Sequence, residues 1–256
     1  MNVLQLCLIL LTTYATPISS EIQRRSLTLE DSSEVRYALA LPEDVDLNQP
    51  VPLILALHYS WQGELPSYFG LTFLVRLIAP AFEELGAIIV APDAPERDWL
   101  SPRSQRAIWA VMDEVRSEFQ VDPRRVLITG FSLGGLGTWY MASEHADFFS
   151  AAIPIATAPT VVRGDTNAEP EYRRFLREGT VPWRESLRAI PFFVVHSRAD
   201  ELIDFDRVEQ AVEDLRTKGA SIEFVAVDGI GHYEVMNYVE SVALAVPWIR
   251  NIWSTR

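Results

Sequence analysis

Short apolar segments alternate with amphipathic segments along almost the whole of this 256-residue chain. Several apolar segments are continuous runs, which is typical of strands that are buried on both faces. The expected strands are 35–42, 51–59, 87–94, 125–132, 151–156, 191–197 and 222–229. The expected helices between them are 73–85, 104–119, 135–145, 207–218 and 235–252. Repeated strand–helix–strand units predict an α/β fold, with a mostly parallel central sheet and helices on both of its faces.

Two parts of the chain depart from this alternation. The segments near Ser26–Glu30 and Val35–Pro42 are less apolar, and they suit antiparallel strands at the edge of the sheet. Residues 157–188 are polar and rich in loop-forming residues, and they lie between two expected strands. We interpret them as an insertion over the sheet, either a short lid or a surface loop. The chain has no internal repeat, so residues 21–256 are expected to form a single domain.

The charge and the cysteine count exclude several classes of function. The chain has 22 basic and 35 acidic residues, and its net charge of −13 argues against nucleic-acid binding, which needs a basic surface. Cys7 is the only cysteine, which excludes an intrachain disulfide, a thiolate zinc site and an iron–sulfur cluster.

Residues 1–20 contain no acidic or basic side chain, and their apolar run extends from Val3 to Leu11. This run is too short to cross a bilayer as a helix, so stable membrane insertion is not expected. It fits a secretory signal peptide cleaved between Ala15 and Ser20, although no basic residue precedes the apolar run. The alternative is a frayed N-terminal arm. Export predicts a secreted or periplasmic protein, whereas an uncleaved segment would leave the protein in the cytoplasm.

A GxSxG pentapeptide, Gly130 to Gly134, is the most specific chemical signal in the chain. It ends the strand RVLIT and begins a helix, which is the strand–turn–helix setting of a nucleophile elbow. Such a turn strains the serine backbone and exposes the hydroxyl group, while the two glycines avoid clashes with neighbouring backbone. The motif therefore predicts Ser132 as a nucleophile at the carboxyl end of a central strand. The alternative is a glycine-rich turn with a buried serine.

A serine hydroxyl needs a base to accept its proton, and the base needs a carboxylate to orient it. In a fold with a nucleophile elbow, the order along the chain is serine, acid, histidine. Of the four histidines, His58 precedes the serine, His145 ends the helix that follows it, and His196 precedes any suitable acid. His232 remains, in a glycine-bearing loop after the last strand, and is the predicted base.

The acid is expected between Ser132 and His232, just past the end of a strand. Asp200 fits best, because it follows the strand PFFVVHS directly. Asp204 is the next candidate, followed by Glu201 and Asp206. The alternative for Asp204 and Asp206 is a solvated position at a helix N-terminus, where the helix dipole favours carboxylates.

Two backbone N–H groups are expected to stabilise the oxyanion of an acyl-transfer reaction. One belongs to Leu133, the residue after the nucleophile. The other belongs to the loop after LILALH, at Tyr59 or Ser60, and His58 is expected to shape this loop by hydrogen bonding.

With these residues in place, the chain resembles the α/β-hydrolase superfamily, from about Val35 to the C-terminus. It looks most like small phospholipase/carboxylesterases and secreted polyhydroxyalkanoate-depolymerase or feruloyl-esterase-like enzymes. The matching segments are Arg36-Tyr37, Leu41-Pro42, PLILALH, VAPDAP, VDPRRVLITGFSLGG, AAIPIA, VVHSRAD and GHYEV. Tyr59 and Ser197 depart from the resemblance, because each follows a histidine where these families commonly have a glycine.

The resemblance implies a serine esterase with an α/β-hydrolase fold, a small-molecule ester substrate, and no cofactor or metal. The alternatives are a serine peptidase of the same superfamily, for which no propeller or large cap domain is found, and a non-catalytic esterase-like binding protein. Trp61, Trp99 and Trp183 are candidates to line the substrate pocket, but loop aromatic residues also serve as simple packing.

Overall fold

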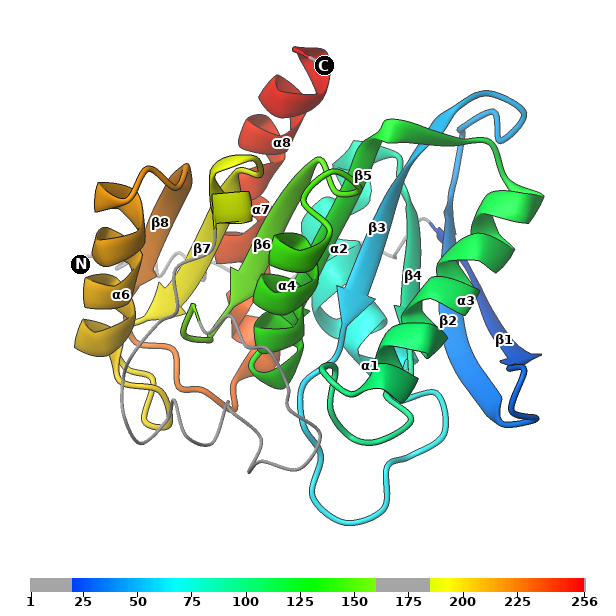
Figure 1. Ribbon diagram of the computed structural model, residues 1–256, viewed down its shortest axis with the longest axis horizontal. Coiled ribbons are helices and arrows are strands. Elements are labelled where there is room, and N and C mark those ends of the chain that lie inside the picture. The colour runs from blue at the N-terminus through cyan, green and yellow to red at the C-terminus, as the bar shows by residue number, and fades with distance from the viewer. Residues whose placement is uncertain (1–19, 160–184, 256) are drawn as a thin grey trace, which may run out of the picture.

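One eight-stranded sheet forms the centre of the molecule (Figure 1). The computed structural model describes residues 20–159 and 185–255. The strands are β1 (Ser20–Thr28), β2 (Glu34–Pro42), β3 (Val51–Leu57), β4 (Ile88–Pro92), β5 (Val121–Phe131), β6 (Ala151–Ile155), β7 (Phe192–Ser197) and β8 (Ile222–Val227). Their order across the sheet is β1-β2-β4-β3-β5-β6-β7-β8. Each expected strand is therefore present, and the predicted α/β-hydrolase fold is confirmed.

The sheet is parallel from β4 to β8, while β1 pairs antiparallel with β2 and β2 pairs antiparallel with β4. The expectation of antiparallel strands at this edge is confirmed. β1 begins at Ser20, six residues before the expected Ser26. Residues 23–25 are polar and lack an apolar signal, and the backbone ladder to β2 holds them in place.

Helices cover both faces of the sheet (Figure 1). On one face lie α3 (Pro102–Glu118), α4 (Leu133–Glu144) and α6 (Phe205–Thr217). On the other face lie α1 (Phe69–Phe73), α2 (Ala79–Phe82), α7 (Val239–Ala243) and α8 (Ala245–Ser254). Each face has its own apolar cluster, because strands buried on both sides present side chains alternately to each helical layer.

Two of the expected helices are broken into shorter pieces. The expected helix 73–85 is a series of α1, a π-helical turn Leu74–Ile78, α2 and a 3-10 turn Glu83–Leu85. Pro80 has no N–H to donate to the preceding turn, and the wider π-helical turn accommodates this gap. The expected helix 235–252 begins as a 3-10 turn Val235–Tyr238 and continues as α7 and α8.

The predicted signal segment and most of the predicted insertion 157–188 lie outside the described residues, so the lid remains a prediction. After the gap the chain resumes with a 3-10 turn, Glu185–Arg188, just before β7. Among the residues described, no helix is both long and apolar enough to span a bilayer.

Candidate active site

Ser132 lies on a sharp turn between β5 and α4, with φ 53° and ψ −112°. A non-glycine residue rarely adopts this backbone conformation, so the surrounding packing must hold it. A Cβ atom on Gly130 would lie 2.3 Å from the oxygen of Gly134, and a Cβ on Gly134 would lie 1.8 Å from the oxygen of Leu57. Only glycine fits at these two positions, which explains the spacing of the GxSxG sequence.

Ser132, His232 and Asp200 form a continuous chain of hydrogen bonds. The distance from Ser132 Oγ to His232 Nε2 is 2.9 Å, and that from His232 Nδ1 to Asp200 Oδ2 is 2.8 Å. With its proton on Nδ1, His232 donates to the carboxylate and can accept the hydroxyl proton of Ser132 through Nε2. The three residues come from the ends of β5, β7 and β8, which meet at one edge of the sheet.

Asp200 is buried, and each of its carboxylate oxygens has a hydrogen-bond partner. Oδ2 faces His232, while Oδ1 accepts the N–H of Leu202 at 3.0 Å and that of Ile203 at 2.7 Å. Burial raises the pKa of Asp200, but the hydrogen bonds from His232 and Ile203 outweigh this effect and leave the pKa below its ordinary value. The carboxylate is therefore charged at neutral pH and able to orient the imidazole ring.

His196 supports the turn that carries this acid. It is fully buried at the end of β7, and its Nε2 donates to the backbone oxygen of Ile203 at 2.9 Å. Burial lowers the pKa of His196, which keeps the ring neutral beside Asp200. This hydrogen bond occupies the ring nitrogen of His196 that lies nearest to the acid. The contact agrees with the prediction that His196 is not the base.

The backbone of His232 is held by a second carboxylate. Glu201, the residue after the acid, accepts the N–H of His232 at 2.8 Å. Glu234 accepts the N–H of Gly231 at 2.7 Å. From the sequence, Glu201 is a candidate only for the acid, and Glu234 is not among the predicted site residues. Glu234 stands three residues after Gly231, a spacing typical of a carboxylate that caps a nearby backbone N–H, and this signal could have identified it.

The other acidic candidates have structural positions. Asp204 is the N-cap of α6 and accepts the N–H of Arg207 at 3.0 Å. Asp206 is exposed in the first turn of the same helix. The helix N-terminal interpretation of both residues is confirmed.

The predicted oxyanion donors lie on segments that pass close to Ser132. Leu133 is the first residue of α4, so its N–H has no acceptor in a preceding helical turn. The close approach of Gly134 to the oxygens of Leu57 and His58 brings the end of β3 against the same turn. Tyr59 follows directly, half-buried, and its ring packs edge-on against Phe69, Phe73 and Phe131. Ser60, one residue further on, is exposed.

His58 shapes this loop by hydrogen bonding, as expected. Its Nδ1 donates to the oxygen of Tyr59 at 2.7 Å, and its Nε2 accepts the N–H of Ala94 at 3.1 Å. Burial lowers the pKa of His58 to about 4. The neutral ring joins the loop after β3 to the loop after β4.

The three tryptophans selected as pocket residues have different positions. Trp99 is fully buried beneath the site, and its indole N–H donates to the oxygen of His58 at 2.9 Å, so it offers no surface to a substrate. Of the two alternatives for Trp99, pocket lining and simple packing, packing is confirmed, because the chain after β4 turns inward and packs the indole against Gly137. Trp61 is 42% exposed and packs against Phe69. Trp183 lies outside the described residues.

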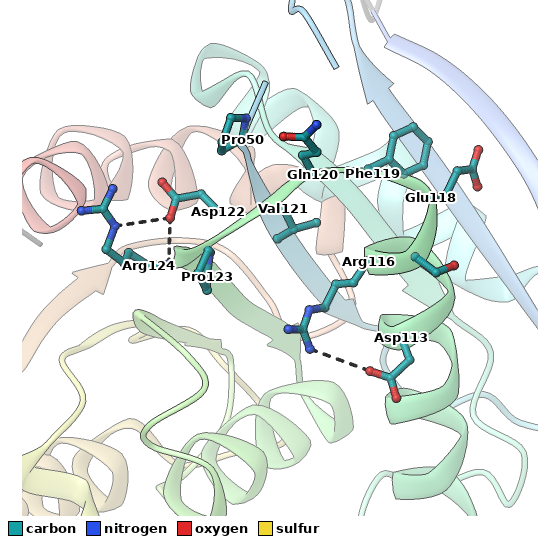
Figure 2. A pocket seen from close by; sticks show the side chains of 11 residues that line it. Pro50, Asp113, Arg116, Glu118, Phe119, Gln120, Val121, Asp122, Pro123 and Arg124 are labelled. Carbon is teal, nitrogen blue, oxygen red and sulfur yellow. Dashed lines mark hydrogen bonds and ion pairs between the residues drawn. The ribbon is translucent and has the colours of Figure 1, made fainter. Parts of the chain in front are cut away.

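A separate cavity of about 770 Å³ lies at the amino end of β5, at the opposite edge of the sheet from Ser132. Figure 2 shows its charged side chains, in which Arg116 pairs with Asp113 at 3.8 Å and Arg124 pairs with Asp122 at 3.5 Å. None of the predicted site residues lines this cavity. Within residues 20–159 and 185–255, no three His, Cys, Asp or Glu side chains are grouped so that they could hold a metal ion.

The strand order and the serine on its strained turn define the class of protein, which is an α/β hydrolase. The family model described as "Prolyl oligopeptidase family" matches residues 103–254. This match covers more than half of the chain, and the chain belongs to the prolyl oligopeptidase family.

The similarity to individual proteins is at low sequence identity. "Probable feruloyl esterase C" of Aspergillus niger is 28% identical over 127 residues, which cover 45% of this chain and 43% of the relative. "Dipeptidyl-peptidase 5" of Porphyromonas gingivalis is 27% identical over 150 residues, 54% of this chain and 21% of the relative. The matches thus span less than half of either relative's length. A solved structure titled "ferulic acid esterase" has a TM-score of 0.71 at 18% identity, and the match covers 91% of this chain and 99% of that one.

Proposed function

We propose that this protein is a serine esterase that hydrolyses carboxylic esters through an acyl-enzyme intermediate. The observation that carries the proposal is the chain of hydrogen bonds from Ser132 through His232 to Asp200. A nucleophile, a base and an orienting carboxylate in this arrangement are the groups that acyl transfer needs. The feruloyl esterase relative supports an ester as the substrate.

In the proposed reaction, Ser132 Oγ attacks the carbonyl carbon of the ester while His232 Nε2 takes the hydroxyl proton. The N–H groups of Leu133 and Tyr59, or of Ser60 in place of Tyr59, donate to the oxyanion. The intermediate then collapses, and His232 returns the proton to the departing alcohol. Water repeats the cycle on the acyl-enzyme, which releases the acid and restores Ser132.

Labelling with a fluorophosphonate probe tests this proposal directly. The wild-type protein is expected to become covalently labelled and to hydrolyse short p-nitrophenyl esters. Ser132→Ala is expected to lose both properties, while its melting temperature shows that the fold persists. Equal labelling of the variant, or no labelling of the wild type, would refute the catalytic role of Ser132.

A serine peptidase is the second candidate, because of the family match and the dipeptidyl-peptidase relative. The two candidates share their nucleophile, so labelling does not separate them. Hydrolysis of p-nitrophenyl esters compared with peptide anilides does. The esterase proposal predicts ester turnover without anilide turnover, and the reverse preference would favour the peptidase.

We also propose that the protein is exported. The proposed cleavage between Ala15 and Ser20 would leave residues 21–28 of β1 in place to pair with β2. N-terminal sequencing of the secreted or periplasmic protein would identify the cleavage site. Recovery of the intact N-terminus from the cytoplasm would contradict export.

A further inference from the structure

Exposed apolar side chains gather on the loops of the site. In the part of the chain that the structure describes, five large apolar residues are exposed: Trp61, Leu202, Tyr233, Met236 and Leu244. The first four follow the carboxyl ends of β3, β7 and β8, the strands next to the site, whereas Leu244 lies between α7 and α8. Single exposed apolar residues are common on protein surfaces, but several that gather around one site indicate a binding surface.

Tyr233 follows His232 directly in the chain, and its ring lies beside the imidazole. It is 71% exposed, and its ring centroid is 5.5 Å from that of His232 in an edge-on arrangement. In the proposed reaction, His232 Nε2 gives its proton to the departing alcohol. The alcohol must therefore lie beside the imidazole, whose edge-on neighbour is the ring of Tyr233.

Leu202 and Met236 extend the same surface. The hydrogen bond from the His232 N–H to Glu201 places the loop after β7 beside the loop after β8. Leu202 follows Glu201 and Tyr233 follows His232, so both lie next to this contact. Two consecutive turns after Gly231, closed by backbone hydrogen bonds from Glu234 and Asn237, keep Met236 close to the loop of His232.

The charges beside this surface disfavour a negatively charged ligand. Glu201 and Glu234 flank the loop on which Tyr233 lies, and both are exposed. A negatively charged alcohol would be repelled by both carboxylates, and the whole chain has a net charge of −13.

We propose that Tyr233, with Leu202 and Met236, forms a subsite for the alcohol portion of the ester, and that this alcohol is apolar and carries no negative charge. The subsite rests on the proposed ester hydrolysis and specifies which leaving group that reaction accepts. Tyr233 is a specificity-determining residue, because its ring contacts the leaving group without taking part in proton transfer.

A series of acetate esters tests the subsite, because the acyl group stays constant. The esters are ethyl acetate, hexyl acetate, an acetate of the same length ending in a carboxylate, and an acetylated methyl xyloside. For each ester, the kcat/KM of a variant is divided by that of the wild type, which removes differences in intrinsic reactivity.

Tyr233→Ala is expected to lower kcat/KM for hexyl acetate about tenfold, through a higher KM, and for ethyl acetate by less than about twofold. Tyr233→Phe is expected to stay within about twofold of the wild type, because it keeps the apolar ring. Leu244→Ala, which removes an exposed apolar side chain away from the site, is the matched control and is expected to leave every ester unchanged. Wild-type protein is expected to prefer hexyl acetate to its carboxylate-bearing counterpart.

Three outcomes would overturn the subsite. Tyr233→Ala could lower turnover of all esters equally, which would make Tyr233 a support for His232 rather than a ligand contact. The loss could be as large for the acetylated xyloside as for hexyl acetate, which would indicate a sugar-stacking surface. The wild type could also fail to prefer the apolar alcohol. Fluorophosphonate labelling and ethyl acetate turnover of the wild type test the esterase proposal separately, so failure of one is distinguishable from failure of the other.

Discussion

On the side of β7 and β8, His232 is held by carboxylates: Asp200 binds its ring and Glu201 binds its backbone N–H. On the side of β3, the predicted oxyanion loop is held by a buried neutral imidazole, His58, and by the indole N–H of Trp99. The first region depends on charged groups, one of them exposed, and the second on aromatic packing and neutral hydrogen bonds. In the proposed reaction the base must move protons and needs charge near it, whereas the backbone donors need only a fixed position.

Substitutions are expected to have different effects in the two regions. Loss of the exposed Glu201 side chain is expected to alter catalysis with little loss of stability, whereas loss of the buried Asp200 carboxylate would also leave the N–H groups of Leu202 and Ile203 without their acceptor. A change in the aromatic region is expected to alter stability, because His58 and Trp99 are both buried.

The largest expected effect is that of Asp200→Asn. An amide in place of the carboxylate can donate a hydrogen to His232 and so favour the wrong tautomer, with the proton on Nε2 facing the serine. By analogy with other serine hydrolases, kcat is expected to fall by about 10⁴-fold. The matched control is Asp204→Asn, which keeps an N-cap on α6 and is expected to leave kcat unchanged. Steady-state kinetics on a p-nitrophenyl ester would measure both, and a large loss in the control alone would reassign the acid.

A smaller effect is expected for Glu201→Ala, which removes the acceptor for the His232 N–H while keeping the acid. We expect kcat to fall about tenfold with KM unchanged, because the imidazole loses one of its two restraints. Glu201→Gln keeps an amide oxygen that can accept the same N–H and is expected to recover most of the activity.

Glu209→Ala is the control for the loss of one exposed carboxylate, because Glu209 lies on α6. This variant is expected to leave kcat unchanged. If Glu201 positions His232, kcat is expected to be lowest for Glu201→Ala, higher for Glu201→Gln and highest for the wild type. Equal kcat for Glu201→Ala and the wild type would show that the side-chain contact with Asp200 alone positions His232.

The sequence was sufficient to predict the sheet, because strands buried on both faces are continuous apolar runs. The glycines of the pentapeptide likewise identified a close approach of backbone at Ser132, where the structure has a strained turn. The role of Glu201 could not be predicted, because its partner lies 31 residues away and the contact follows no periodicity. Trp99 could not be placed either, since a tryptophan in a loop has the same local sequence whether it turns inward or outward.

The last expected effect concerns stability rather than rate, and it is a pH dependence on the β3 side. The pKa of His58 is lowered to about 4 in the folded protein from an ordinary value of 6.5. Between these values the unfolded chain binds a proton and the folded protein does not, so the free energy of unfolding falls as the pH falls from 6.5 towards 4. The contribution of one such group is about 1.4 kcal/mol per pH unit in this range. Urea unfolding of the wild type and of His58→Gln at pH 7 and pH 5 would measure it. The variant is expected to be less stable at pH 7 but to lose less stability on acidification, whereas parallel losses would mean that another group, such as His196, governs the acid sensitivity.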